Sequence, residues 1–144
     1  MNTTIYTLGY IGRKLESVDA LLVRLDALLV DVRMVPRSRV LTWNSGHLRR
    51  HFGDRYEWIK ELGNRNYKDS AAQIEILDFP AGEQRLREII ITTGKPIILM
   101  CGCVDVNHCH RKLLAEWLSK QWNAPVEHLT RPVNPDSDQQ LTLF

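Results

Sequence analysis

Side chains that could carry out chemistry gather in one short stretch of this sequence. All three cysteines and two of the five histidines lie between residues 101 and 110. The stretch follows the apolar run 97–100, which predicts a buried strand, and precedes a pattern typical of an amphipathic helix. Thiol and imidazole groups at a strand end suit nucleophilic catalysis or metal binding. The residues concerned are Cys101, Cys103, Cys109, His108 and His110.

A cysteine nucleophile is the first interpretation of this stretch. Cys101 would stand at a strand exit, ahead of a helix N-terminus and near arginines, an environment that lowers the pKa of a thiol and favours the thiolate. His108 or His110 would act as acid or base, with Asp31 as a further catalytic candidate. Cysteine-dependent phosphatases place an arginine six positions after the cysteine, where this chain has Asn107. We therefore do not expect simple phosphatase chemistry.

Two other interpretations of the same stretch stay open. Zinc could be held by a Cys3His set, although the Cys-x-Cys and Cys-x-His spacings are tighter than the usual two-residue gap. The set would be drawn from Cys101, Cys103, Cys109 and either His108 or His110. Alternatively, the loop binds an anion without covalent chemistry, and His110 is either an acid or base or an ordinary core histidine. The arginines that could grip a phosphate are Arg13, Arg33, Arg37 and Arg111. No cofactor other than zinc is indicated.

The pattern of apolar residues predicts the elements that position these groups. Alternating or continuous apolar runs typical of strands cover residues 3–8, 27–33, 55–62, 97–100 and 124–129. Helical periodicity covers residues 15–28, 45–52, 82–93 and 108–122. Strand, helix and strand within the first 33 residues indicate a parallel unit. The sequence therefore predicts an α/β domain over residues 1–130, with a mainly parallel sheet of about five strands and helices on both faces, a Rossmann-like three-layer arrangement.

Details of the predicted helices concern their starts and their inward faces. Ser45 is a candidate N-cap for the basic helix 45–52, and Asp105 or Asn107 could cap the helix 108–122. In that last helix the expected inward stripe continues back to His110. Its apolar members are Leu113, Leu114, Trp117 and Leu118. Residues 64–81 are largely polar and irregular, which predicts a long loop of the kind that is often functional.

Three strand exits carry most of the chemically active side chains. They lie at residues 9–13, 31–39 and 101–111. Because parallel strands bind ligands outside their carboxyl ends, we expect these exits to form one cleft. For Asp31, an alternative role is an ion pair with an arginine that ties down a loop. The residues expected to bind phosphate there are Tyr10, Arg13, Arg33, Arg37, Ser38 and Arg111, beside the catalytic candidates Cys101, His108, His110 and Asp31.

Composition restricts the class of protein. The chain has 144 residues, 44% hydrophobic and 25% charged, and a formal net charge of +2. Such a small charge means that nucleic-acid binding would need a local basic patch. No apolar run approaches the ~20 residues that cross a bilayer, and no signal peptide is recognisable. The three clustered cysteines do not resemble a secreted disulfide framework, so we expect a cytoplasmic protein that does not enter membranes.

Several of these pieces together resemble an uncharacterised family, domain of unknown function 488. The matching pieces are residues 7–13, 29–33, 36–39, 61–63, 99–101 and 108–117. The chain departs from the family pattern at Asn64, where a second glycine is typical, and at Cys103, which is an additional cysteine. The resemblance implies an α/β fold and a cleft at the matched positions, without an established reaction.

The C-terminal segment carries a second resemblance. Residues 131–140 are rich in proline and small polar groups, which predicts a flexible tether. The last five residues resemble the Gln-Leu-Ser/Asp-Leu-Phe peptide with which bacterial polymerases and repair proteins bind the replication sliding clamp. Leu141, Leu143 and Phe144 would enter an apolar pocket while Gln140 makes polar contacts.

The sequence thus leads to one functional hypothesis and two alternatives. We expect a nucleic-acid repair or processing enzyme that is recruited to DNA through the clamp and holds a phosphate or nucleotide in its cleft. The reaction is not specified by any motif. The alternatives are a non-catalytic, DNA-associated module that binds a nucleotide and a cysteine-dependent enzyme that acts on small molecules.

Overall fold

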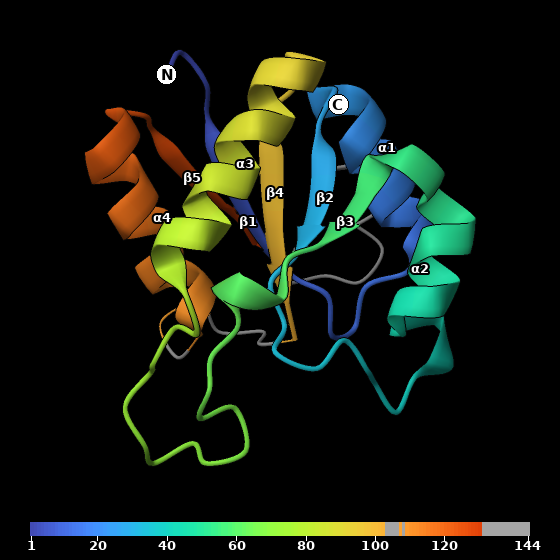
Figure 1. Cartoon of the computed structure of the whole chain (residues 1–144). Coiled ribbons are helices and arrows are strands. Elements are labelled where there is room, and N and C mark those ends of the chain that lie inside the picture. The colour runs from blue at the N-terminus through green and yellow to red at the C-terminus, as the bar shows by residue number, and fades with distance from the viewer. Residues whose placement is uncertain (103–106, 108, 131–144) are drawn as a thin grey trace.

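The computed structural model describes residues 1–102, 107 and 109–130. They form a five-stranded sheet with helices on both faces (Figure 1). The strand order is β3-β2-β4-β1-β5, and every neighbouring pair is parallel. The predicted α/β fold is therefore confirmed. The predicted tail, residues 131–144, lies outside the described residues.

The elements alternate along the chain as the sequence predicts. The strands are β1 (Ile5–Gly9), β2 (Leu28–Asp31), β3 (Tyr56–Trp58), β4 (Ile97–Cys101) and β5 (Val126–Leu129). The helices are α1 (Leu15–Leu25), α2 (Ser45–Phe52), α3 (Phe79–Thr93) and α4 (His110–Trp122). The short 3-10 helices are η1 (Leu41–Trp43), η2 (Gly53–Arg55) and η3 (Lys60–Leu62). In the part of the chain that is described, no helix has the length and apolar character needed to cross a membrane.

The central strand β4 links the two hydrophobic cores. All five of its residues are buried. Successive side chains of a strand point to opposite faces, so Ile97 and Leu99 pack with α3 and α4, whereas Ile98 and Met100 pack with α1 and α2. Burying one such side chain stabilises the fold by about 1.5–3 kcal/mol. The continuous apolar run of β4 is thus what a strand covered on both faces requires.

The register brings three strand ends to one edge of the sheet. Gly9 at the end of β1 pairs with Cys101 at the end of β4, and Asp31 at the end of β2 pairs with Met100. The arrowheads of β1, β2 and β4 accordingly lie together at the lower end of the sheet in Figure 1. The segments that follow these strands therefore begin close to one another.

Several element boundaries differ from the prediction, among them the end of β3 and the start of α3. The third strand was expected over residues 55–62, but β3 covers only Tyr56–Trp58 and the chain then turns into η3. Helix α3 begins at Phe79, before the expected residue 82, because the Asp78 carboxylate accepts a hydrogen bond from the Ala81 N–H and caps the helix. A proline in the first turn, Pro80, is compatible with that start.

The predicted helix caps were wrong where the structure describes them. The N-cap position of α2 is occupied by Asn44 and not by Ser45. The Asn44 side chain does not bond to the helix but accepts a hydrogen bond from the Ser38 N–H at 2.6 Å. The residue that caps α4 is Cys109 and not Asn107, and it makes no side-chain cap hydrogen bond. The other candidate, Asp105, lies outside the described residues.

The buried stripe of α4 also differs from the expected one. Its buried members are Arg111, Leu114, Ala115, Leu118 and Trp122. Trp117 was expected to face the core but is 38% exposed, and its ring contacts Phe79 edge-on with the centroids 5.0 Å apart. The buried stripe therefore begins at Arg111 and is rotated relative to the predicted one.

The long loop predicted from residue 64 is present and covers residues 63–78. It extends beyond the ends of the strands, at the bottom of Figure 1. Its two arms are joined near the base, where Asn64 pairs with Ile76 and the Asn64 side chain accepts hydrogen bonds from the N–H groups of Asn66 and Glu75, each at 3.0 Å. At the start of the loop, Gly63 lies directly against the backbone of Met34.

We predict that the Gly63→Ala variant is destabilised by about 1–3 kcal/mol, the usual cost of overpacking. A methyl group at Gly63 would lie 2.6 Å from Met34 Cα and 2.8 Å from Met34 N, and these backbone atoms cannot rotate away. Urea denaturation followed by circular dichroism measures the loss. The control is Gly46→Ala in α2, where the nearest atom is 3.6 Å away at the end of the Arg50 side chain. Equal stabilities for the two variants would show that the contact with Met34 is not tight.

Candidate functional site

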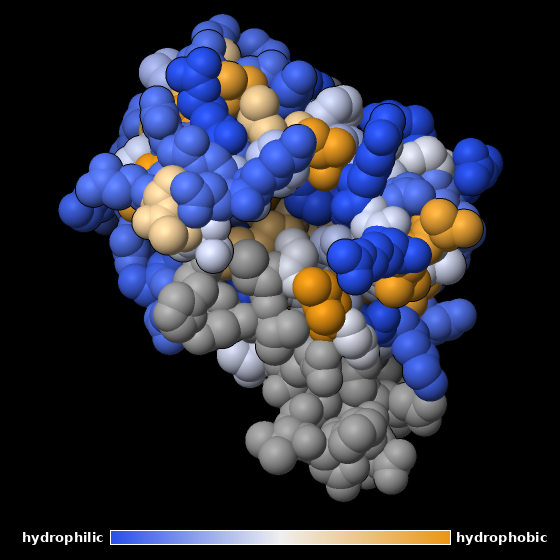
Figure 2. All heavy atoms as spheres, turned by 90° about the horizontal axis from the view of Figure 1, so that it is seen from below, coloured by the Kyte–Doolittle hydropathy of each residue, from blue (hydrophilic) through white to orange (hydrophobic). Residues whose placement is uncertain are grey.

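A cavity of about 700 Å³ lies at the edge of the sheet where β2 and β4 end. Its wall is built from three segments that are distant in sequence, and Figure 2 views the molecule from this side. The segment after β2 contributes Arg33, Met34, Val35 and Arg37. The 63–78 loop contributes Asn64, Asn66, Tyr67, Asp69, Ser70, Ala72 and Ile74. The end of β4 and the start of α4 contribute Cys101, Gly102, Asn107 and His110.

A buried ion pair fixes the part of the wall that follows β2. Asp31 is fully buried, and its two carboxylate oxygens accept hydrogen bonds from Arg33 Nε at 2.8 Å and Arg33 Nη2 at 2.6 Å. The Tyr56 hydroxyl donates a third bond at 2.6 Å. Burial alone would lower the pKa of Arg33, but the hydrogen bond and the charge of Asp31 outweigh it and raise that pKa. Burial, followed by the charge of Asp31, raises the pKa of Tyr56.

This arrangement matches the structural role considered for Asp31, an ion pair that ties down a loop. Asp31 is not among the residues that line the cavity. Arg33 does line it, but two of its nitrogens are held by Asp31. Its third nitrogen, Nη1, donates to Tyr10 Oη at 3.4 Å, and the guanidinium lies 5.0 Å from the centre of the Tyr10 ring. Tyr10 in turn stacks on Trp43, so the Arg33 guanidinium lies between its ion-pair partner Asp31 and a pair of stacked aromatic rings.

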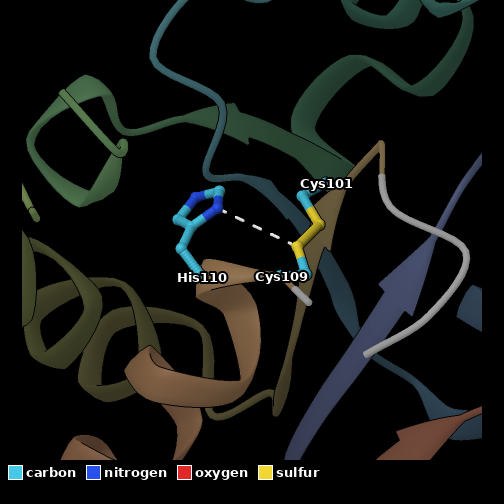
Figure 3. A group of neighbouring side chains, drawn as sticks. All are labelled: Cys101, Cys109 and His110. Carbon is cyan, nitrogen blue, oxygen red and sulfur yellow. Dashed lines mark hydrogen bonds between the residues drawn. A yellow bond between two sulfur atoms is a disulfide. The ribbon is translucent and has the colours of Figure 1, made fainter. Parts of the chain in front are cut away.

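Two cysteines meet at the end of β4, where Cys101 forms part of the floor of the cavity and Cys109 is buried behind it. Cys101 ends β4, Cys109 precedes α4, and their sulfur atoms are joined in a disulfide (Figure 3). This bond was not predicted from the sequence. Both residues are only 2% exposed, and Cys101 also lines the cavity. The Arg111 guanidinium donates a hydrogen bond from Nη1 to Cys101 Sγ at 3.5 Å.

His110 stands beside the two sulfur atoms, and its tautomer follows from its contacts. The ring nitrogen Nε2 lies 2.7 Å from the Val32 carbonyl oxygen. A carbonyl oxygen can only accept, so Nε2 carries the proton and the lone pair remains on Nδ1. Nδ1 faces Cys109 Sγ at 3.9 Å, as Figure 3 shows. Burial lowers the pKa of His110, and the charge of Arg111 adds to this effect, so the neutral imidazole is favoured.

Other predicted site residues have structural contacts or lie elsewhere. Arg13 donates to the Gly9 carbonyl at 3.2 Å and to the Leu129 carbonyl at 3.1 Å, which ties the end of β1 to β5, and it does not line the cavity. Ser38 accepts a hydrogen bond from the Val40 N–H within its own turn. Arg37 is exposed and lines the cavity. The remaining predicted residues lie outside the described part of the chain: His108, Cys103, Gln140, Leu141, Leu143 and Phe144.

The polar residues of the 63–78 loop and the partners of the Asp31–Arg33 ion pair were not predicted from the sequence as parts of the site. Asn64, Asn66 and Ser70 line the cavity, and their amide and hydroxyl groups were a signal that could have been used. Tyr56 was assigned only to a strand. Trp58 donates its indole N–H to the Arg33 carbonyl at 2.9 Å, and nothing local in the sequence indicates that contact.

The site combines groups for binding and groups for reaction. Amide, hydroxyl and guanidinium groups on its wall can bind a polar or anionic molecule. The sulfur atoms of Cys101 and Cys109 and a nitrogen of His110 lie within 4.8 Å of one another, and soft ligands of this kind bind thiophilic metal ions. Among the described residues, this group is the candidate for holding a metal.

Comparison with known proteins identifies a family. The family model for the domain of unknown function DUF488 matches residues 24–118. No curated protein and no solved structure matches the chain. The matched region runs from α1 into α4 and includes every segment that lines the cavity. The chain therefore belongs to the DUF488 family.

Proposed function

We propose that this protein binds a nucleotide or a nucleic-acid end in the cavity at the strand ends and processes it there. The observation that supports this function best is the meeting of two kinds of group in one hollow. Arg37 comes from the segment after β2, next to the ion-paired Arg33, whereas Cys101 and His110 come from the region of β4 and α4. A site with both kinds of group can hold an anionic molecule beside groups that are able to react with it.

The size and polarity of the cavity fit a nucleotide. A volume of about 700 Å³ falls within the range of about 300–1,000 Å³ typical of small-molecule sites. Asn64, Asn66 and Ser70 can hydrogen-bond to a base or a ribose, and the Tyr67 ring offers a stacking surface. Arg37 is exposed on the wall and is suited to a phosphate.

The enzymatic part of the proposal depends on the floor of the cavity. A module that only binds nucleotides needs no paired sulfur atoms and no imidazole of fixed tautomer, yet Cys101 and His110 face the same space as the binding groups. The non-catalytic alternative uses the same cavity and differs by showing binding without turnover. Incubation with labelled nucleotides and short oligonucleotides, followed by chromatography, separates the two.

We predict that Arg37→Ala weakens binding of a 5′-phosphorylated fluorescent nucleotide by about 10- to 100-fold. A hydrogen bond to a charged group contributes about 1.5–3 kcal/mol, and about 1.4 kcal/mol corresponds to a factor of ten. Fluorescence anisotropy measures the affinity. Arg39→Ala is the matched control, since Arg39 is also exposed but does not line the cavity. Equal losses in both variants, or no binding by the unaltered protein, would contradict the proposed site.

Recruitment to DNA is a separate part of the proposal, and it depends on the terminal peptide. Gln140, Leu141, Leu143 and Phe144 match the clamp-binding pattern, and residues 131–139 provide the reach. The peptide lies outside the described residues, so its support is its sequence. A bound clamp would bring the cavity to DNA without requiring a strongly basic protein, consistent with the net charge of +2.

We predict that removal of residues 140–144 abolishes capture of the protein by an immobilised bacterial sliding clamp. Leu143→Ala and Phe144→Ala should each cause a large loss, because apolar anchors at interfaces contribute about 2 kcal/mol or more. Thr142→Ser is the control and should bind normally, since the motif accepts serine there. If the truncated protein is still captured, recruitment through this peptide is excluded, whereas the nucleotide-binding proposal is unaffected.

A further inference from the structure

We propose that the reduced protein binds one thiophilic divalent cation, such as Zn²⁺, through Cys101 Sγ, Cys109 Sγ and His110 Nδ1. This inference concerns the floor of the cavity and does not require that the cavity bind a nucleotide. Zinc sites of the catalytic type have three protein ligands and leave a fourth position open. The three residues offer that number of ligands and the soft donor atoms that zinc prefers.

The positions of the ligand atoms suit such an ion. Zn–S and Zn–N distances of about 2.3 and 2.0–2.1 Å place the ligand atoms of a tetrahedral site about 3.5–4 Å apart. His110 Nδ1 and Cys109 Sγ are already 3.9 Å apart, and all three ligand atoms lie within 4.8 Å of one another. The Cα atoms of the cysteines are 7.6 Å apart, beyond the about 4.4–6.8 Å of most disulfides. This separation of the two Cα atoms therefore suits two sulfur atoms that both bind one metal ion at least as well as two sulfur atoms that are bonded to each other.

The contacts of His110 prepare it to be a ligand. Metal-binding histidines usually donate the other ring N–H to a carboxylate or a backbone carbonyl, which fixes the tautomer and the orientation of the ring. His110 donates Nε2–H to the Val32 carbonyl at 2.7 Å. The lone pair of Nδ1 is thereby left on the side of the sulfur atoms (Figure 3). Val32 follows β2, so the neighbouring strand holds the ring in place.

The surroundings of the sulfur atoms also fit a metal centre. Arg111 donates a hydrogen bond to Cys101 Sγ at 3.5 Å, and such bonds to a thiolate tune its strength as a ligand. Two thiolates balance the charge of a divalent cation. Cys101 and His110 line the cavity, whereas Cys109 is buried behind them. The cation can therefore enter from the cavity, and its fourth position would face that space.

The disulfide is then the oxidised form of the same site. Each thiolate gives up one electron to an oxidant such as hydrogen peroxide, which takes up two electrons and two protons and becomes two water molecules. The new S–S bond removes both thiolate ligands, so the cation leaves. A thiol reductant reverses the step by thiol–disulfide exchange and restores the dithiolate. Metal binding thus depends on the redox state of Cys101 and Cys109.

Titration of the reduced, chelator-treated full-length protein with Co²⁺ and Zn²⁺ tests the proposal. We expect one equivalent of Co²⁺ to bind with a thiolate-to-metal charge-transfer band, and Zn²⁺ to displace it. Zn²⁺ should also protect Cys101 and Cys109 from alkylation, as located by mass spectrometry. Treatment of the Zn²⁺ complex with hydrogen peroxide should release the metal to a chromogenic chelator.

Variants identify the ligands. Cys101→Ser, Cys109→Ser and His110→Ala should each weaken Zn²⁺ binding by more than about 100-fold, the upper end of the effect of losing an outer-shell partner. His47→Ala, in α2 and outside this group of ligands, is the control and should bind normally. Circular dichroism checks the fold of each variant, and the cobalt spectrum and alkylation pattern of the unaltered protein do not depend on the variants folding. The proposal is overturned if the reduced protein binds neither ion, or if both cysteine variants bind Zn²⁺ as well as the unaltered protein.

Discussion

The buried carboxylate of Asp31 is the constraint on which the cavity depends. A charge that is removed from water must be paired and hydrogen-bonded, because an isolated buried carboxylate is strongly unfavourable. Asp31 meets this requirement with Arg33 and Tyr56. The bonds tie the end of β2 to β3 and set the direction in which the chain leaves the sheet. They also hold Arg33 against Tyr10, so this part of the cavity wall is attached directly to strand β2.

The same constraint changes the character of the site. Arginines were expected to surround a phosphate, but Arg33 is largely occupied by Asp31, Arg13 binds backbone carbonyls, and Arg111 lies against Cys101. Among the described residues, Arg37 is the exposed arginine on the wall. The cavity is therefore not an arginine clamp. Recognition of a ligand would depend mainly on the amide and hydroxyl groups of the 63–78 loop.

The fold class could be predicted from the sequence, because it depends on the pattern of apolar residues along the chain. The continuous apolar residues of β4 could only be buried on both faces, and that predicts a parallel sheet between two layers of helices. The meeting of the β2 and β4 exits followed from the same reasoning. Boundaries were less accurate, because the start of α3 depends on the Asp78 cap and the end of β3 on the turn into η3. Such contacts involve only a few atoms and hardly affect the periodicity of the apolar residues.

The residues that line the site were harder to predict, because a long side chain at a strand end can point toward the cavity or away from it. Arg13 follows β1 in sequence, yet its guanidinium reaches away from the cavity to the Leu129 carbonyl of β5. The order of the strands, which no local pattern specifies, makes β5 the neighbour of β1. The contact between Cys101 and Cys109 likewise joins the end of β4 to the start of α4, and no local pattern specifies it. Residue type identified the candidates, and topology decided their partners.

The position of the cavity follows from the direction of two neighbouring crossovers. Strand β2 leads to α2, which packs on one face of the sheet, whereas its neighbour β4 leads to α4 on the other face. Chains that leave adjacent strands toward opposite faces leave a crevice between them, and ligands of open α/β sheets bind at such points. In this protein the 63–78 loop supplies the remaining wall of that crevice. The paired sulfur atoms and His110 therefore lie at the crevice between the chains that leave β2 and β4.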